Sequence, residues 1–116
     1  MFKKESIWIH SLQVNGFDQQ LILRLEPTYD KKAYNDHITI ERALGKGNGY
    51  EAVFTLPFKD IISISYKKPF LFGLCTISID IPNGDARLKD IKVERDFFDK
   101  SSWRKIVRIW EDSKQL

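Results

Sequence analysis

The sequence predicts a mainly β domain in which seven strands, over about residues 6–94, are followed by one amphipathic helix over about residues 101–114. Three observations support this fold class. Apolar and polar residues alternate along most of the chain, as they do in half-buried strands. Turn-forming residues separate the alternating runs, and only near the C-terminus does the apolar period change to that of a helix. With 116 residues, the chain has the length of a single domain.

The first half of the chain contains four alternating runs, over residues 7–14, 21–26, 37–42 and 50–56. Asn15-Gly16 follows the first run, and both residues tolerate a positive φ, so the first two runs should form a hairpin. A glycine-rich turn at residues 45–49 links the third and fourth runs. Pro57 has no backbone N–H to donate, so the fourth strand should end there or lie at a sheet edge.

The second half contains three predicted strands, over residues 61–66, 76–81 and 86–94. A short corner at residues 58–60 precedes them. Alternation predicts that Ile62, Ile64 and Tyr66 share one face of the fifth strand. A seven-stranded set splits into two packed sheets or curls into a barrel, and in either case an open end remains to be covered.

The C-terminal segment is predicted to be the helix that covers this end. Trp103, Ile106, Val107 and Trp110 are spaced i, i+3, i+4 and i+7, which places them on one helical face. A serine at position 101 or 102 can cap the first turn. Two tryptophans on one short helix bury a large apolar area, so we expect this face to pack against the strands.

Composition excludes several classes of protein. The 19 basic and 16 acidic residues give a net charge of +3, and the excess is spread over residues 59–116, which is more diffuse than is usual in nucleic-acid-binding domains. The single cysteine excludes an internal disulfide framework and a multi-cysteine metal site. Residues 1–6 lead into alternation rather than an apolar signal-peptide segment, so we expect a cytoplasmic domain.

The order of elements resembles the pleckstrin-homology-like (PH-like) superfold: four strands, a corner, three strands and a capping helix. In its pattern of apolar, proline and glycine positions it is most similar to GRAM domains and small bacterial PH-like domains. Their apolar-Pro-x-x-Asp-Ile-x-x-Ile corner resembles residues 56–64, and an apolar strand, a Gly-containing turn and an aromatic pair follow at residues 77–81, Gly84 and Phe97-Phe98. The similarity covers about residues 54–110.

This resemblance implies a barrel of two packed antiparallel sheets, of four and three strands. It also implies a non-catalytic interaction module that binds a protein partner or self-associates as a homo-oligomer. In the family, lipid head groups are bound by Lys and Arg near the first hairpin, but residues 13–20 contain neither. Because phosphate recognition depends on such cations, we do not expect specific phosphoinositide binding.

The segment from Lys67 to Gly73 is the main candidate for a contact site, with Lys67, Lys68, Phe70 and Leu71 as its contact residues. Lysines beside large apolar residues suit an anionic membrane surface, so peripheral membrane association is an alternative function. They also suit docking of a protein partner. In the third interpretation, Phe70 and Phe72 point inward to start the sixth strand, and only residues 67–69 are exposed.

No residue set carries an enzymatic signature, so we expect no catalysis, cofactor or metal. Residues 45–49 resemble a phosphate loop, but a strand rather than a helix follows them. Cys75, His10 and His37 are isolated in the sequence, and Cys75 opens an apolar strand, where a cysteine behaves as a small hydrophobic residue.

An oligonucleotide-binding barrel is the remaining alternative. Such barrels expose aromatic side chains on a strand face for base stacking. Trp8 is the one candidate, because it faces opposite to Ile7 and Ile9. An outward tryptophan also packs under a loop or a second subunit, and the cations of the helix are few. We therefore do not expect nucleic-acid binding.

Overall fold

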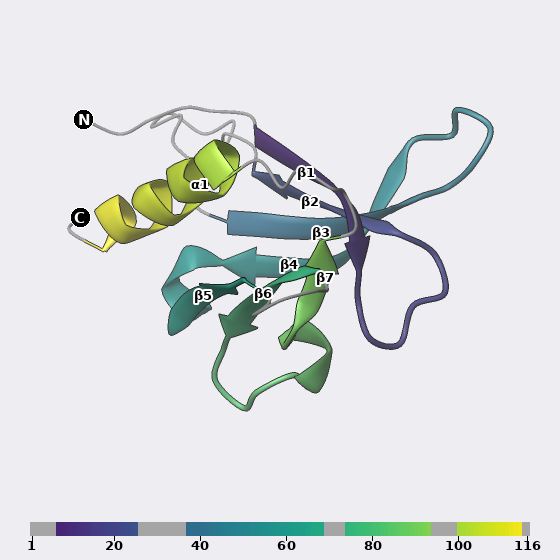
Figure 1. The fold of residues 1–116 in the computed structure, drawn as a ribbon. Coiled ribbons are helices and arrows are strands. Elements are labelled where there is room, and N and C mark those ends of the chain that lie inside the picture. Colours follow the sequence, from purple (N-terminus) through teal and green to yellow (C-terminus); the bar gives the residue numbers. More distant parts are fainter. Residues whose placement is uncertain (1–6, 26–36, 69–73, 94–99, 115–116) are drawn as a thin grey trace, which may run out of the picture.

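The computed structural model describes residues 7–25, 37–68, 74–93 and 100–114 (Figure 1). Seven strands and one helix account for most of them. Their bounds are β1 Ile7–Gln13, β2 Leu21–Leu25, β3 His37–Ala43, β4 Tyr50–Pro57, β5 Ser63–Lys67, β6 Cys75–Asp80, β7 Ile91–Val93 and α1 Lys100–Ser113. Two short 3₁₀ helices, η1 (Phe58–Asp60) and η2 (Ala86–Leu88), precede β5 and β7. The predicted mainly β class, strand number and C-terminal helix are confirmed.

All seven strands pair antiparallel in one sheet, in the order β4-β3-β2-β1-β7-β6-β5. The chain therefore forms two meanders, β1–β4 and β5–β7, which meet where β1 pairs with β7. Among the described residues, two registered pairs make this junction, Leu12 with Val93 and Gln13 with Lys92. The sheet continues across it instead of dividing into separate sheets of four and three strands.

The closed barrel implied by the resemblance is not formed by the described residues. β4 and β5 are the two ends of the sheet order and do not pair with each other. Pro57, the last residue of β4, has no N–H to donate, and η1 then turns the chain before β5 begins. The expectation that Pro57 ends an edge strand is confirmed, and the same feature helps to keep the sheet open.

The fifth and seventh strands are shorter than predicted. β5 begins at Ser63 because η1 precedes it and Ile61 enters the core. Ile62 precedes β5 and is 56% exposed, whereas Ile64 and Tyr66, which are predicted to share its face, are half-buried against the core. β7 contains three residues, because Asp85 accepts a hydrogen bond from the Arg87 backbone N–H and stabilises η2 instead of a strand.

One buried cluster contains residues from both meanders and from α1. Figure 1 shows α1 at one end of the sheet, with the β1–β2 and β3–β4 turns projecting at the other end. Of the four helix residues singled out by spacing, Trp103, Ile106 and Trp110 are buried, and Val107 is half-buried against the core. Ile109, which the spacing argument omitted, is also buried.

Candidate interaction surface

The predicted contact segment is described only in part. Lys67 ends β5, and both Lys67 and Lys68 are exposed. Phe70 and Leu71 lie outside the described residues, as does the rest of 69–73. Whether this segment is a contact site or a strand connection therefore stays a prediction. Within the described ranges, no helix is long and apolar enough to cross a membrane.

The residues considered for catalysis lie in different surroundings. The Cys75 Sγ is 3.3 Å from the Tyr66 Oη, and burial together with this hydrogen bond raises the pKa of Tyr66 to about 12. His10 instead stacks on Trp8. Across the described parts of the chain, no three His, Cys, Asp or Glu side chains form a group that could hold a metal ion.

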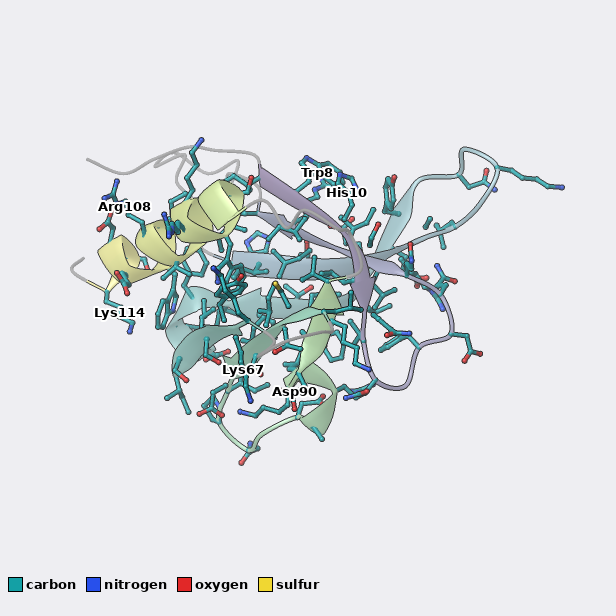
Figure 2. The ribbon with its side chains drawn as sticks, in the orientation of Figure 1. Trp8, His10, Lys67, Asp90, Arg108 and Lys114 are labelled. Atoms are coloured by element: carbon teal, nitrogen blue, oxygen red, sulfur yellow. The ribbon has the colours of Figure 1, made fainter. Side chains whose placement is uncertain are left out.

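A different group of side chains gathers on the outer face of β1–β4. Trp8 is registered opposite Arg24, and Arg24 opposite Thr39. Directly opposed residues share a sheet face, so these three lie in one row across β1, β2 and β3. Their neighbours Ile7 and Ile9 point the other way, into the core. Figure 2 shows Trp8 and His10 close together at β1.

Three side chains contact the Trp8 indole. The guanidinium carbon of Arg24 lies 4.6 Å from the ring centroid, in cation–π geometry. The His10 imidazole stacks at 5.9 Å with an interplanar angle of 6°. The Tyr50 ring meets the indole edge-on, also at 5.9 Å. Residues 42 positions apart in the sequence thus meet because β1 and β4 belong to the same meander.

A buried carboxylate holds Arg24 in this position. Glu41 is only 7% exposed, and among the described residues it is the buried charged side chain. Its Oε1 accepts a hydrogen bond from the Arg24 Nη1 at 3.2 Å, and its Oε2 accepts one from the Thr39 hydroxyl at 2.7 Å. A paired carboxylate with both oxygens occupied restricts the rotamers of Arg24 and Thr39. The support under Trp8 is therefore pre-organised.

We call Trp8, His10, Arg24, Glu41 and Tyr50 the Trp8 surface. Two of its members are exposed: His10, and Tyr50, which is 46% exposed. Leu44, which follows β3 at the start of the β3–β4 turn, is 47% exposed. Aromatic residues and arginine are enriched among the residues that dominate protein–protein binding energies. The composition of the Trp8 surface is of this kind.

The charges on and beside this surface balance. Arg24 pairs with Glu41, and Arg42 pairs with Glu51 through a 2.7 Å contact that β3–β4 pairing brings together. Two cations therefore meet two carboxylates. Such a face has little net field with which to attract a polyanion.

Sequence reasoning identified Trp8 as outward-facing but missed the residues around it. Alternation alone places Arg24 and Glu41 on outward positions of their strands, which is a usable signal. Their contact depends on the β2–β3 register, and the Tyr50 contact depends on β4 pairing, neither of which the sequence of one strand reveals.

No family model, curated protein or solved structure matches this chain. The fold and the Trp8 surface are therefore the features from which a function is inferred.

Proposed function

We propose that this chain is a non-catalytic interaction module of the PH-like class, and that it binds a protein partner through the Trp8 surface. The observation that carries the proposal is the packing of Trp8 against Arg24, His10 and Tyr50 on the outer face of the sheet. Tryptophan, tyrosine and arginine are the residue types that are enriched in interface hot spots. The ion pair that holds the arginine in place lowers the entropic cost of binding.

The PH-like part of the proposal is supported by the order of elements. Four antiparallel strands in a meander, a 3₁₀ corner, three further strands and a packed C-terminal helix occur in the order that the resemblance implies. In this proposal the division between the four-stranded and three-stranded parts lies at the β1–β7 junction. In the described part of the chain that junction has two registered pairs, and the twist between neighbouring strands allows the sheet to change direction there.

The chemistry of the surface favours a partner segment that is apolar and carries little net charge. Arg24 and Arg42 are each neutralised by a carboxylate, so a strongly acidic segment would find neither of these two described arginines free to pair with it. The exposed parts are the aromatic rings of His10 and Tyr50, which can pack against an apolar side chain. Base stacking on Trp8 is disfavoured because Arg24 and His10 already lie against its indole.

Selection from a displayed random-peptide library tests the proposal. The wild-type domain is the bait, and the double variant His10→Ser/Tyr50→Ser is the counter-selection bait. Both positions are exposed, so the variant should fold normally. We expect enriched peptides with an aromatic or large aliphatic residue and low net charge, binding the wild type more than about tenfold better than the variant, as for loss of one hot-spot residue.

Two controls make the outcome readable. Lys59→Ser/Ser63→Ala changes two exposed residues outside the Trp8 surface and should leave peptide binding unchanged. Peptides that bind the His10→Ser/Tyr50→Ser variant as well as the wild type would contradict the proposal.

Sedimentation velocity over a range of protein concentrations reports whether the partner is a second copy of the chain. Self-association that His10→Ser/Tyr50→Ser abolishes would identify a second copy of the chain as the occupant.

A further inference from the structure

A second surface lies on the outer face of β5–β7. Lys67 is registered opposite Thr76, and Thr76 opposite Lys92, so the three side chains form one row across three strands. The core-side neighbours Ile77 and Ile91 are fully buried, and both lysines are exposed. Because adjacent strands are about 4.8 Å apart, the two lysine stems leave the sheet about 10 Å from each other.

The lysines of this row differ from four other described cations in their ion pairing. Arg24, Arg42, Arg87 and Lys89 each have a carboxylate partner. Within the described residues, Lys67, Lys68 and Lys92 have no ion pair. Among the nearby described acids, Asp80 is paired with Lys89, and Asp90 is exposed two residues before Lys92. Against the one carboxylate of Asp90, the described residues carry the charges of Lys67, Lys68 and Lys92, so this described part of the face keeps an excess of positive charge.

An exposed apolar side chain lies at the same end of the strands. Leu74 immediately precedes β6 and is 39% exposed. Lys67 pairs with Thr76, two residues from Leu74, so the leucine and the lysines are neighbours. We call Lys67, Lys68, Leu74, Thr76 and Lys92 the lysine surface. Figure 2 shows Lys67 and Asp90 on the opposite side of the molecule from Trp8 and His10.

We propose that the lysine surface is a peripheral contact site for an anionic lipid bilayer. Charge complementarity identifies the occupant: lysine ammonium groups that have no ion pair among the described residues meet lipid head groups as point charges, and Leu74 can enter the boundary of the acyl chains. The row contains neither an arginine for bidentate phosphate binding nor an aromatic residue for base stacking, which a nucleic acid would use. The site excludes residues 69–73 and is separate from the Trp8 surface.

Vesicle sedimentation tests this site. The probes are vesicles of phosphatidylcholine alone and of phosphatidylcholine mixed with phosphatidylserine. We expect the wild type to bind only the mixed vesicles, and to lose binding as salt is raised. Each lysine near an anionic surface contributes about fivefold in partitioning, equivalent to about 1 kcal/mol, so Lys67→Glu/Lys92→Glu should weaken binding by more than about tenfold.

A matched variant separates the site from net charge. Lys59→Glu/Lys105→Glu alters two lysines that are also exposed but lie on η1 and α1, and it changes the net charge by the same amount. We expect it to weaken binding by less than about threefold, since distant charges are screened. Leu74→Ser should weaken the binding that remains at high salt. Thermal unfolding of each variant should match that of the wild type, because all these positions are exposed.

Several results would overturn the assignment. One is equal binding of the wild type to neutral and mixed vesicles, or to neither. Another is an equal loss in the two double-lysine variants, because net charge alone would then explain binding. A duplex DNA or polyglutamate probe that binds the wild type while vesicles do not would assign the face to a different polyanion. Vesicle binding should be unaffected by His10→Ser/Tyr50→Ser, so the result stands or fails independently of the Trp8 surface.

Discussion

The guanidinium of Arg24 lies 4.6 Å from the centroid of the Trp8 ring while its Nη1 donates to the buried carboxylate of Glu41. These contacts join the half-buried aromatic ring to the charge of Glu41. Arg24 can support Trp8 only while its own charge is compensated, because an unpaired, half-buried guanidinium is costly. The stability of the β1–β3 region and the shape of the Trp8 surface therefore depend on the same ion pair.

Glu41→Ala should destabilise the domain by about 1–3 kcal/mol, because it removes the acceptor for both Arg24 and the Thr39 hydroxyl. Chemical denaturation measures this change. Glu51→Ala is the matched control: it breaks the Arg42 pair, whose side chains are 45% and 50% exposed, and should cost less than about 1 kcal/mol. Equal destabilisation by the two variants would show that Glu41 does not support a buried network.

Trp110→Ala should destabilise the domain by about 3–5 kcal/mol, because it opens a cavity between α1 and the core. Trp110→Phe should cost clearly less. Among the described residues the buried Trp110 Nε1 has no hydrogen-bond partner, so phenylalanine removes this donor while it keeps a large aromatic ring in place. Thermal unfolding of both variants and of the exposed control Arg108→Ala checks the order. A Trp110→Ala domain as stable as the control would contradict the packing of α1.

Tyr66 should ionise only at high pH. Burial and the hydrogen bond to Cys75 raise its pKa from 10.0 to about 12. A raised folded-state pKa means that this contribution to stability is fully present below about pH 10 and is lost as pH rises toward 12. Tyrosinate absorbance against pH should show a late step that Tyr66→Phe removes. Persistence of that step in Tyr66→Phe would assign it to another residue.

Asp85 should titrate at a lower pH than an ordinary aspartate. Hydrogen bonds from the Arg87 side chain and backbone N–H lower its pKa below the usual 3.8. A depressed folded-state pKa means that the contribution is present above pH 3.8 and is lost as pH falls through the lowered value. In Arg87→Ala the Asp85 pKa, followed by carboxyl chemical shifts, should rise toward 3.8. An unchanged value would show that the Arg87 side chain has no effect on this carboxyl group.

The elements whose apolar pattern is local were predicted well from the sequence. The alternation of β1–β4 and the helical spacing of Trp103, Ile106 and Trp110 record burial directly, because one face of each element meets the core. The wrongly predicted strand boundaries lie where a side chain or a 3₁₀ turn replaces the hydrogen bonds between strands. At Asp85, capping replaces the start of a predicted strand, and the 3₁₀ corner at Phe58–Asp60 delays the start of β5 to Ser63.

The candidate sites were less predictable, because they depend on strand register. Trp8 faces outward by alternation alone, but its contact with Arg24 follows from β1–β2 pairing, and the contact of Tyr50 requires β4 in place. Likewise, Lys67 and Lys92 are 25 positions apart and become neighbours only through Thr76. Single-strand periodicity specifies a face but not which residue stands opposite.

The most direct test of the proposed function is a nuclear magnetic resonance titration of the labelled domain with the tightest library-selected peptide, following the indole N–H signals of its three tryptophans. Trp8 lies on the outer face, whereas Trp103 and Trp110 are each 5% exposed and packed in the core. The proposal predicts that the Trp8 signal shifts on binding, together with the backbone signals of His10 and Tyr50, while the other two indole signals stay in place. An unchanged Trp8 signal, with shifts confined to β5–β7 or α1, would contradict it.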